Sequence, residues 1–217
     1  MAETMTFTSL KEDVQNYLER GASSTTDPMV YDQIPRLIAL AETRIAVELK
    51  VLGFKRVVTG TLTAGVAAYD KPDRWRETLS INIGTGATNE TRKQLFARAY
   101  EYLVAYWPDR TDTDEPEFYA DYDYDHWLIV PTPDAAYPWE ISYYEKPQQL
   151  DATNETNWLT DIAPNLLLYA TLLEAAPFLK NDARLQVWQQ LYDRSMAAIS
   201  GEDVDKIMDR NSSRKAA

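Results

Sequence analysis

Residues 34–63 read IPRLIALAETRIAVELKVLGFKRVVTGTLT, and the apolar pattern changes within this stretch. Up to Gly53, apolar residues recur every three or four positions, which is the period of an amphipathic helix. After Gly53, β-branched residues dominate residues 57–63, which is typical of a strand. Since glycine commonly ends helices, the stretch predicts a long helix that leads directly into a β region. The apolar helix positions are Ile34, Leu37, Ile38, Ala41, Ile45, Leu49 and Leu52.

Helical patterns also flank this stretch on both sides. Upstream, Ser9 and Glu12 have the spacing of a capping box at the start of an amphipathic helix. Downstream, a helix that is apolar on most of its circumference is predicted from about Thr160 to Ala176, and another from residue 181 until Gly201. A helix that is apolar nearly all round lies centrally among other helices or against a neighbouring subunit.

The middle third is predicted to be mostly β. Short β-branched runs at 66–69, 79–83, 126–130 and 139–144 predict strands, and the proline-rich loop between the last two predicts a hairpin. Residues 91–107 predict a short helix across the sheet, which Pro108 ends.

Together these elements predict an α+β fold. We expect a helical bundle from the N- and C-terminal helices (residues 1–53 and 155–201) and an inserted, mostly β domain (residues 54–154). The polar residues 202–217 are expected to be a flexible C-terminal arm.

Composition excludes several classes of function. The 217 residues contain no cysteine and one histidine, which excludes a disulfide framework, a zinc–thiolate site and a multi-histidine metal site within one chain. The net charge of −12 argues against sequence-independent binding of nucleic acid. The first residues predict no secretory signal, and no apolar run reaches the length of a membrane span. We therefore expect a soluble protein that is made in a reducing cytoplasm or is indifferent to redox state.

The acidic charge is concentrated in residues 109–125. Eight acidic residues and one basic residue, Arg110, give this segment a local charge of −7. Residues 121–125 match the first three ligand positions of a calcium loop, but His126 stands where that loop needs glycine and Thr132 where it needs glutamate, which excludes an EF-hand. A solvated loop and a weak or shared cation site remain open. The acidic residues are Asp109, Asp112, Asp114, Glu115, Glu117, Asp121, Asp123 and Asp125.

Motifs of catalysis are missing from the sequence. It contains no dinucleotide-binding, P-loop or nucleophile-elbow motif, and no pair of carboxylates is singled out by an apolar setting. His126 is interpreted as a strand or interface residue rather than a general base. We therefore predict no enzymatic activity, no catalytic residues, no cofactor and no resident metal. Alternation in residues 139–144 places Trp139, Ile141 and Tyr143 on one core-facing side of a strand, with an interface role as the alternative.

Several motifs, taken in order, resemble the head-to-tail adaptor (connector) proteins of tailed bacteriophages, which form a ring beneath the portal. The resemblance covers about residues 8–200. It is strongest in Tyr137-Pro-Trp-Glu-Ile-Ser-Tyr-Tyr-Glu-Lys-Pro147, Asn154-Glu-Thr-Asn-Trp-Leu159, Ala163-Pro-Asn-Leu-Leu-Leu-Tyr-Ala170 and Trp188-Gln-Gln-Leu-Tyr192, and Tyr69-Asp-Lys-Pro-Asp-Arg-Trp75 supports it upstream.

The resemblance implies a structural virion protein in the neck or tail region, made in the host cytoplasm. It implies a homo-oligomeric ring, by analogy of twelve subunits, that binds the portal protein and a tail or nozzle protein and through which DNA passes without specific binding. The acidic segment is then a candidate for the channel wall or the tail-facing rim. A candidate portal-binding arm lies at the C-terminus, where residues 206–217 carry a local charge of +3 from Lys206, Arg210, Arg214 and Lys215 against one aspartate.

Two other functions remain as alternatives. The tyrosine and tryptophan content favours a tail accessory module that binds a glycan or receptor. The many carboxylates leave open a hydrolase that acts on cell-wall sugars.

Overall fold

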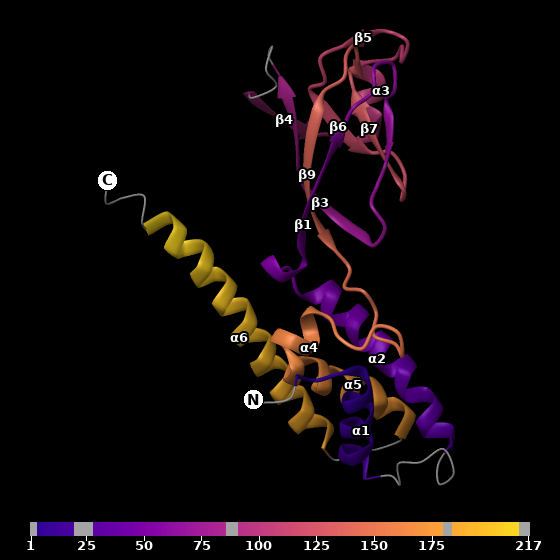
Figure 1. Cartoon of the computed structure of the whole chain (residues 1–217), viewed down its shortest axis with the longest axis vertical. Helices are drawn as coiled ribbons and strands as arrows, with labels where there is room; N and C mark the ends of the chain where they lie inside the picture. The colour runs from indigo at the N-terminus through magenta and orange to yellow at the C-terminus, as the bar shows by residue number, and fades with distance from the viewer. Residues whose placement is uncertain (1–3, 20–27, 86–90, 180–183, 213–217) are drawn as a thin grey trace. The chain divides into compact units, whose positions relative to one another are not determined.

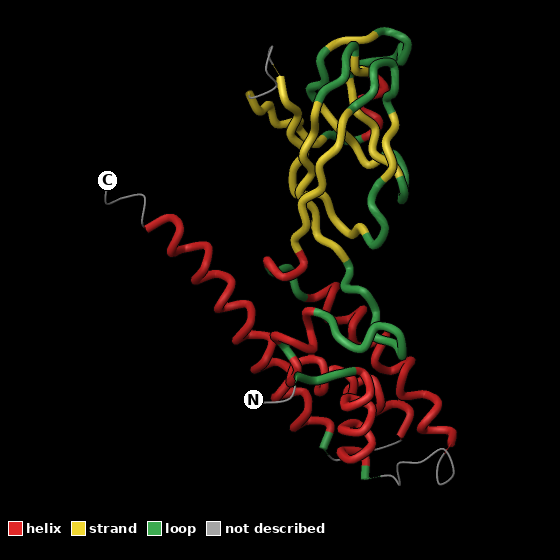
Figure 2. Tube along the Cα trace, in the orientation of Figure 1, coloured by secondary structure: helices red, strands yellow, loops and turns green. Residues whose placement is uncertain are grey.

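The computed structural model describes residues 4–19, 28–85, 91–179 and 184–212, and it is a mixed α+β structure (Figure 1). The chain divides into two compact units. Residues 1–54 and 146–217 form what we call the helical unit, and residues 55–145 form the β unit. Figure 2 shows that the β unit is built mainly from strands, and its described residues also include helix α3 (Tyr100–Tyr106).

Helix α5 packs against the other helices of its unit. The helical unit contains α1 (Phe7–Leu18), α2 (Pro28–Glu48), the short 3-10 helix η1 (Leu52–Phe54), α4 (Trp158–Ile162), α5 (Pro164–Leu179) and α6 (Leu185–Ser212). Helix α5 contacts α1, α2, α4 and α6. It therefore has apolar neighbours on several sides, which explains why apolar residues cover most of its circumference.

The start of α1 differs from its prediction. Thr6, not Ser9, is the N-cap: its hydroxyl accepts the Ser9 N–H, and the Ser9 hydroxyl accepts the Thr6 N–H. Serine can occupy the third helical position of a capping box because its hydroxyl reaches back to the free backbone donor. The helix consequently begins three residues earlier and buries Phe7.

Seven strands form one curled sheet in the β unit. Their order is β1 (Lys55–Thr61), β9 (Pro138–Glu145), β3 (Trp75–Thr85), β4 (Thr91–Ala97), β6 (Phe118–Asp121), β7 (His126–Val130) and β2 (Ala68–Asp70). Neighbours are antiparallel except β4 and β6, which are parallel. Two short parallel strands, β5 (Thr113–Asp114) and β8 (Thr132–Pro133), pair separately, and α3 spans Tyr100–Tyr106.

Two predictions for the β region are wrong. Residues 91–97 form strand β4 rather than the first half of a helix, because they pair with β3 and bury Leu95 opposite Ile81. Tertiary pairing here overrides the local helical pattern. The predicted hairpin of residues 126–130 and 139–144 does not form either, because both edges of β9 are occupied by β1 and β3, while β7 pairs with β6 and β2.

The predicted core face of β9 is confirmed. Ile141 and Tyr143 belong to the buried cluster of the β unit, and Trp139 packs against it. Trp127 is fully buried in the same cluster, and its indole Nε1 donates to the Thr78 hydroxyl at 2.8 Å. A buried tryptophan with a satisfied N–H contributes a large apolar area without a desolvation penalty.

The predicted end of the last helix at Gly201 is also wrong. Helix α6 continues through Gly201 to Ser212, and a Cβ added at Gly201 would meet nothing within 4 Å. A single glycine costs a helix only about 1 kcal/mol, so good helix formers on either side carry the helix through it. Within the described ranges, no helix has the length and apolarity that crossing a membrane requires.

Candidate functional site

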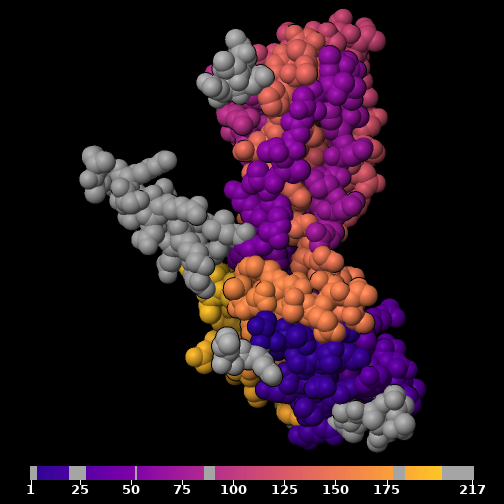
Figure 3. Space-filling view, in the orientation of Figure 1, coloured from indigo at the N-terminus to yellow at the C-terminus, as the bar shows by residue number. Residues whose placement is uncertain are grey.

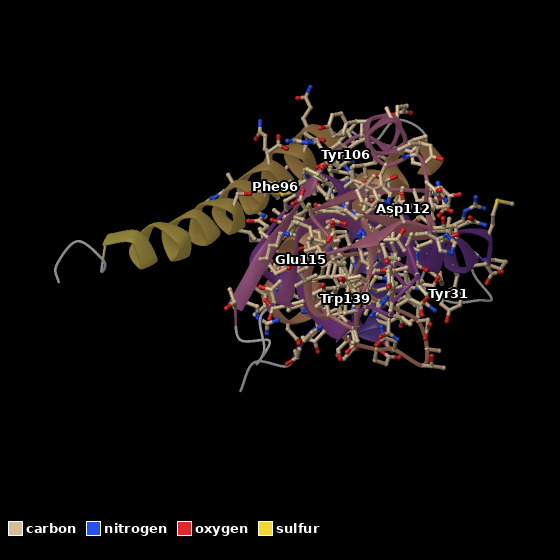
Figure 4. All side chains as sticks on the ribbon, turned by 90° about the horizontal axis from the view of Figure 1, so that it is seen from above. Tyr31, Phe96, Tyr106, Asp112, Glu115 and Trp139 are labelled. Carbon is tan, nitrogen blue, oxygen red and sulfur yellow. The ribbon has the colours of Figure 1, made fainter. Side chains whose placement is uncertain are left out.

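The acidic segment lies entirely within the β unit, and strand β6 divides it into two groups. The group before β6 lies around β5, at one end of the unit (Figure 1), and Asp112 and Glu115 are labelled there in Figure 4, which views the molecule from that direction. The group after β6 forms the turn into β7. Seven of the eight carboxylates are exposed, and Glu115 is half-buried.

Two lysines neutralise part of this charge. Lys93 on β4 lies 2.6 Å from Glu115 and 4.0 Å from Glu117. Lys71 is buried except for 2% of its side chain, and its ammonium group lies 2.9 Å from a carboxylate oxygen of Asp121. These contacts connect the acidic segment to strand β4 through Lys93. They also connect it to strand β2 through Lys71, the residue that follows β2.

Lys71 also holds the turn after β6. Its Nζ donates to the Asp123 carbonyl at 2.8 Å and lies 3.8 Å from the centre of the Trp75 ring. A buried ammonium needs such partners, because an unpaired buried charge is strongly unfavourable. Sequence reasoning did not identify Lys71, although a lone lysine between Asp70 and Asp73 was a visible signal.

Asp123 organises the same turn through its carboxylate. One oxygen accepts the backbone N–H groups of Asp125 and His126, at 2.8 and 2.7 Å. The His126 Nδ1 lies 2.8 Å from both oxygens, and the His126 Nε2 lies 3.3 Å from Asp70. Desolvation alone would raise the pKa of Asp123, but the hydrogen bonds from His126 and the backbone outweigh it and lower the pKa. The hydrogen bond with Asp123 in turn raises the pKa of His126.

This geometry does not favour a cation site in residues 121–125. The carboxylates of Asp121 and Asp123 point to a lysine and to their own turn rather than to a common centre. In the part of the chain that the structure describes, no group of three or more histidine, cysteine, aspartate or glutamate residues is arranged to hold a metal ion. A solvated acidic turn is therefore the better interpretation.

The remaining acidic side chains leave negative charge exposed to solvent. Asp109 accepts the hydroxyl and N–H of Thr111, and these hydrogen bonds lower the pKa of its carboxyl group. Asp114 accepts the N–H of Glu115. The exposed carboxylates therefore give this part of the segment a negative charge that can repel an anionic polymer.

A carboxyl group suited to acid–base chemistry would have a raised pKa. Among the described residues, the carboxyl group with a raised pKa is Glu42, in the helical unit, where burial raises the value to about 7. Its two oxygens accept hydrogen bonds from the Leu150 N–H and the Asn157 side chain, at 3.2 and 2.6 Å. These contacts attach the segment after β9 to α2, so the role of Glu42 is structural.

The proposed C-terminal arm is only partly described. Lys206 and Arg210 belong to helix α6, while Arg214 and Lys215 lie outside the described residues. The structure therefore brings Lys206 and Arg210 onto one helix, one turn apart.

The chain was also compared with known proteins. The family model described as SU10 adaptor protein matches residues 5–215, nearly the whole chain. No match was found among curated proteins. The family is one of structural phage adaptors of the virion neck and is not a known enzyme family. The match agrees with the resemblance found in the sequence motifs. The chain thus belongs to the SU10 adaptor protein family and is a structural adaptor protein of a bacteriophage.

Proposed function

We propose that this protein forms a ring, of twelve subunits by analogy, that joins the portal protein to the tail or nozzle and surrounds the DNA channel. The family match over residues 5–215 is the observation that carries the proposal. We infer that the helical unit is a helical bundle and that both units take part in the ring.

The exposed carboxylates before β6 fit the wall or rim of a channel. Asp109, Asp112 and Asp114 are exposed and belong to a chain whose net charge is −12. In a ring, each subunit repeats this charge around the axis. Like charge keeps DNA from adhering to the wall, so that the genome can slide.

The C-terminal part of the chain is proposed to bind the portal. Residues 206–217 are basic, whereas the rest of the chain is acidic. Lys206 and Arg210 both belong to α6 and lie one helical turn apart, so a partner that binds this part of the helix could contact both.

The proposal is tested by electron microscopy and mass measurement of the purified protein, alone and mixed with portal protein. Rings of the protein alone or on the portal support the proposal, and a monomer that does not bind the portal protein refutes it.

Truncation after Gly201 tests the C-terminal arm. We expect a folded protein that no longer joins portal-bearing heads. Normal assembly of the truncated protein would remove the role of the arm without affecting that of the ring.

A further inference from the structure

Strand β1 is an uncovered edge of the seven-stranded sheet. It is the outermost strand, and among the described residues its strand partner is β9 alone. All seven of its residues are exposed, including Val57 at 55% and Val58 at 37%. Figure 3 shows the purple chain of this part of the β unit at the surface beside orange β9. Adjacent valines point to opposite faces of a strand, so neither face of β1 is fully covered.

The features that normally protect an edge strand are scarce in β1. It contains no proline, and its register with β9 is continuous over all seven residue pairs, without a bulge. Its charged residues are Lys55 and Arg56, both at its start, and Arg56 is bound to Glu145 at 3.0 Å. A long, regular edge with exposed β-branched residues is a template for pairing with a strand of another chain.

The opposite edge of the sheet is acidic at the corresponding end. Strand β2 is outermost there, pairs with β7, and ends at Asp70, whose side chain is 91% exposed. The turn of residues 121–125 adjoins it, because the Lys71 N–H donates to the Asp125 carbonyl at 2.6 Å. The exposed Asp125 therefore adds to the negative charge at this edge.

Strand register places the basic and acidic groups at the same end of the β unit. Lys55 is paired with Tyr144, and Trp75 with Glu145, so β1 and β3 both start at that end. The acidic turn also lies there, since the Tyr124 ring is 6.4 Å from that of Trp75. The two outermost strands thus carry opposite charge at a matching level of the same unit.

We propose that β1 of one copy pairs with the β2 edge of the next copy, with Lys55 facing Asp70 and Asp125 of its neighbour. The inference rests on the proposed ring, and it names the surface between its subunits. Because the two edges are different surfaces, the contact between copies is heterologous. Such a contact closes into a ring when the rotation between copies allows it. The acidic turn after β6 then lies at the subunit boundary, and the carboxylates before β6 remain for the channel or rim.

A charge-swap experiment tests the pairing. In Lys55→Glu or Asp125→Lys alone, like charges meet at every boundary, and we expect at least about a tenfold loss of rings in electron micrographs. A mixture of the two variants restores opposite charges at each boundary and should restore rings. Arg36→Glu on α2, an exposed change of the same sign as Lys55→Glu, is the matched control and should assemble normally.

A cysteine trap tests the geometry, because the chain has no cysteine of its own. A protein with Val57→Cys mixed with one carrying Ala68→Cys should give covalent dimers under a mild oxidant. The same Val57→Cys protein mixed with Val187→Cys, another exposed valine, should not. Each partner carries one cysteine, so only a bond between copies is detected.

The outcomes separate this inference from the proposed function. If rings form but resist both charge changes and give no trapped dimers, the β1–β2 contact is wrong and the ring stands. If Lys55→Glu assembles into rings but loses binding to portal or tail protein, β1 pairs with that partner instead, which also overturns the contact. If the wild-type protein stays monomeric with and without portal, the ring fails and the contact fails with it.

Discussion

Glu42 makes the helical unit sensitive to pH. Its side chain is buried on α2, with 1% of the residue exposed, and it accepts hydrogen bonds from the Leu150 N–H and the Asn157 amide. Burial raises its pKa from 4.5 to about 7; the two hydrogen bonds oppose this rise, and the nearby charge of Asp151 adds to it. The folded protein therefore holds the proton of Glu42 more tightly than the unfolded chain does.

The sign and size of the effect follow from linkage. The contribution of Glu42 is most favourable below pH 4.5, where both states are protonated, and it declines as the pH rises toward about 7. Each pKa unit corresponds to about 1.4 kcal/mol, so the full decline is of the order of 3 kcal/mol. Above about pH 7 both states are ionised and no further decline is expected.

Glu42→Gln removes this titration. The neutral amide keeps one acceptor and leaves one of the two donors without its bond, which costs about 1 kcal/mol at every pH. We therefore expect the free energy of unfolding of the wild type to fall by about 2–3 kcal/mol more than that of the variant between about pH 5 and pH 8.

Urea unfolding followed by far-ultraviolet circular dichroism measures this difference, because the helices dominate that signal. Glu12→Gln, an exposed position on α1, is the control and should follow the wild type. Equal pH dependence of the wild type and Glu42→Gln, within about 0.5 kcal/mol, would refute the reasoning, since Glu42 would then titrate alike in both states.

Three further predictions concern other contacts. The single histidine gives one imidazole titration in NMR spectra: His126 should titrate above pH 6.5, and Asp123→Asn should lower its pKa, so an unchanged value would contradict the contact. Because the folded pKa is raised, the stabilisation by His126 is present below about pH 6.5 and is lost as the pH rises through the folded value. Lys71→Met should speed amide hydrogen exchange in residues 121–125, while equal protection would show that the lysine does not hold the turn. Gly53→Ala should lower the stability of the helical unit by about 1–3 kcal/mol in thermal unfolding, because its Cβ would lie 2.1 Å from the Trp158 ring; Gly201→Ala, where space is open, is the control and should not destabilise α6.

Glu42 shows which features of a buried residue the sequence pattern predicts and which it does not. It stands four residues after Ile38 and three before Ile45, on the apolar face of the predicted helix, so its burial was detectable from periodicity. Its partners were not, because Leu150 and Asn157 lie 108 and 115 residues away along the chain. The same holds for the acidic partners of Lys71, because Asp121 and Asp123 lie 50 and 52 residues away along the chain.

Local sequence patterns were least reliable where a segment could form either a helix or a strand. Residues 91–97 belong to the stretch of residues 91–107 that predicts a helix, yet their pairing with β3 makes them a strand. The proline-rich stretch between β7 and β9 predicts a hairpin loop, but it contains strand β8, and the strands on either side have other partners. Strand propensity reports a fit to a pleated surface and does not specify the neighbour.

The sequence by itself determined the class of the molecule and its family. Amphipathic periodicity, the change of pattern at Gly53 and the order of motifs from Tyr69 to Tyr192 depend on residues that are close together in the chain, so they can be interpreted without a structure. Only the tertiary structure decided the order of the strands, which strands are outermost in the sheet, and the division of the acidic segment by β6. These features depend on pairings between distant residues, because hydrogen bonds across a sheet and the burial of charge are set by spatial neighbours rather than by neighbours in sequence.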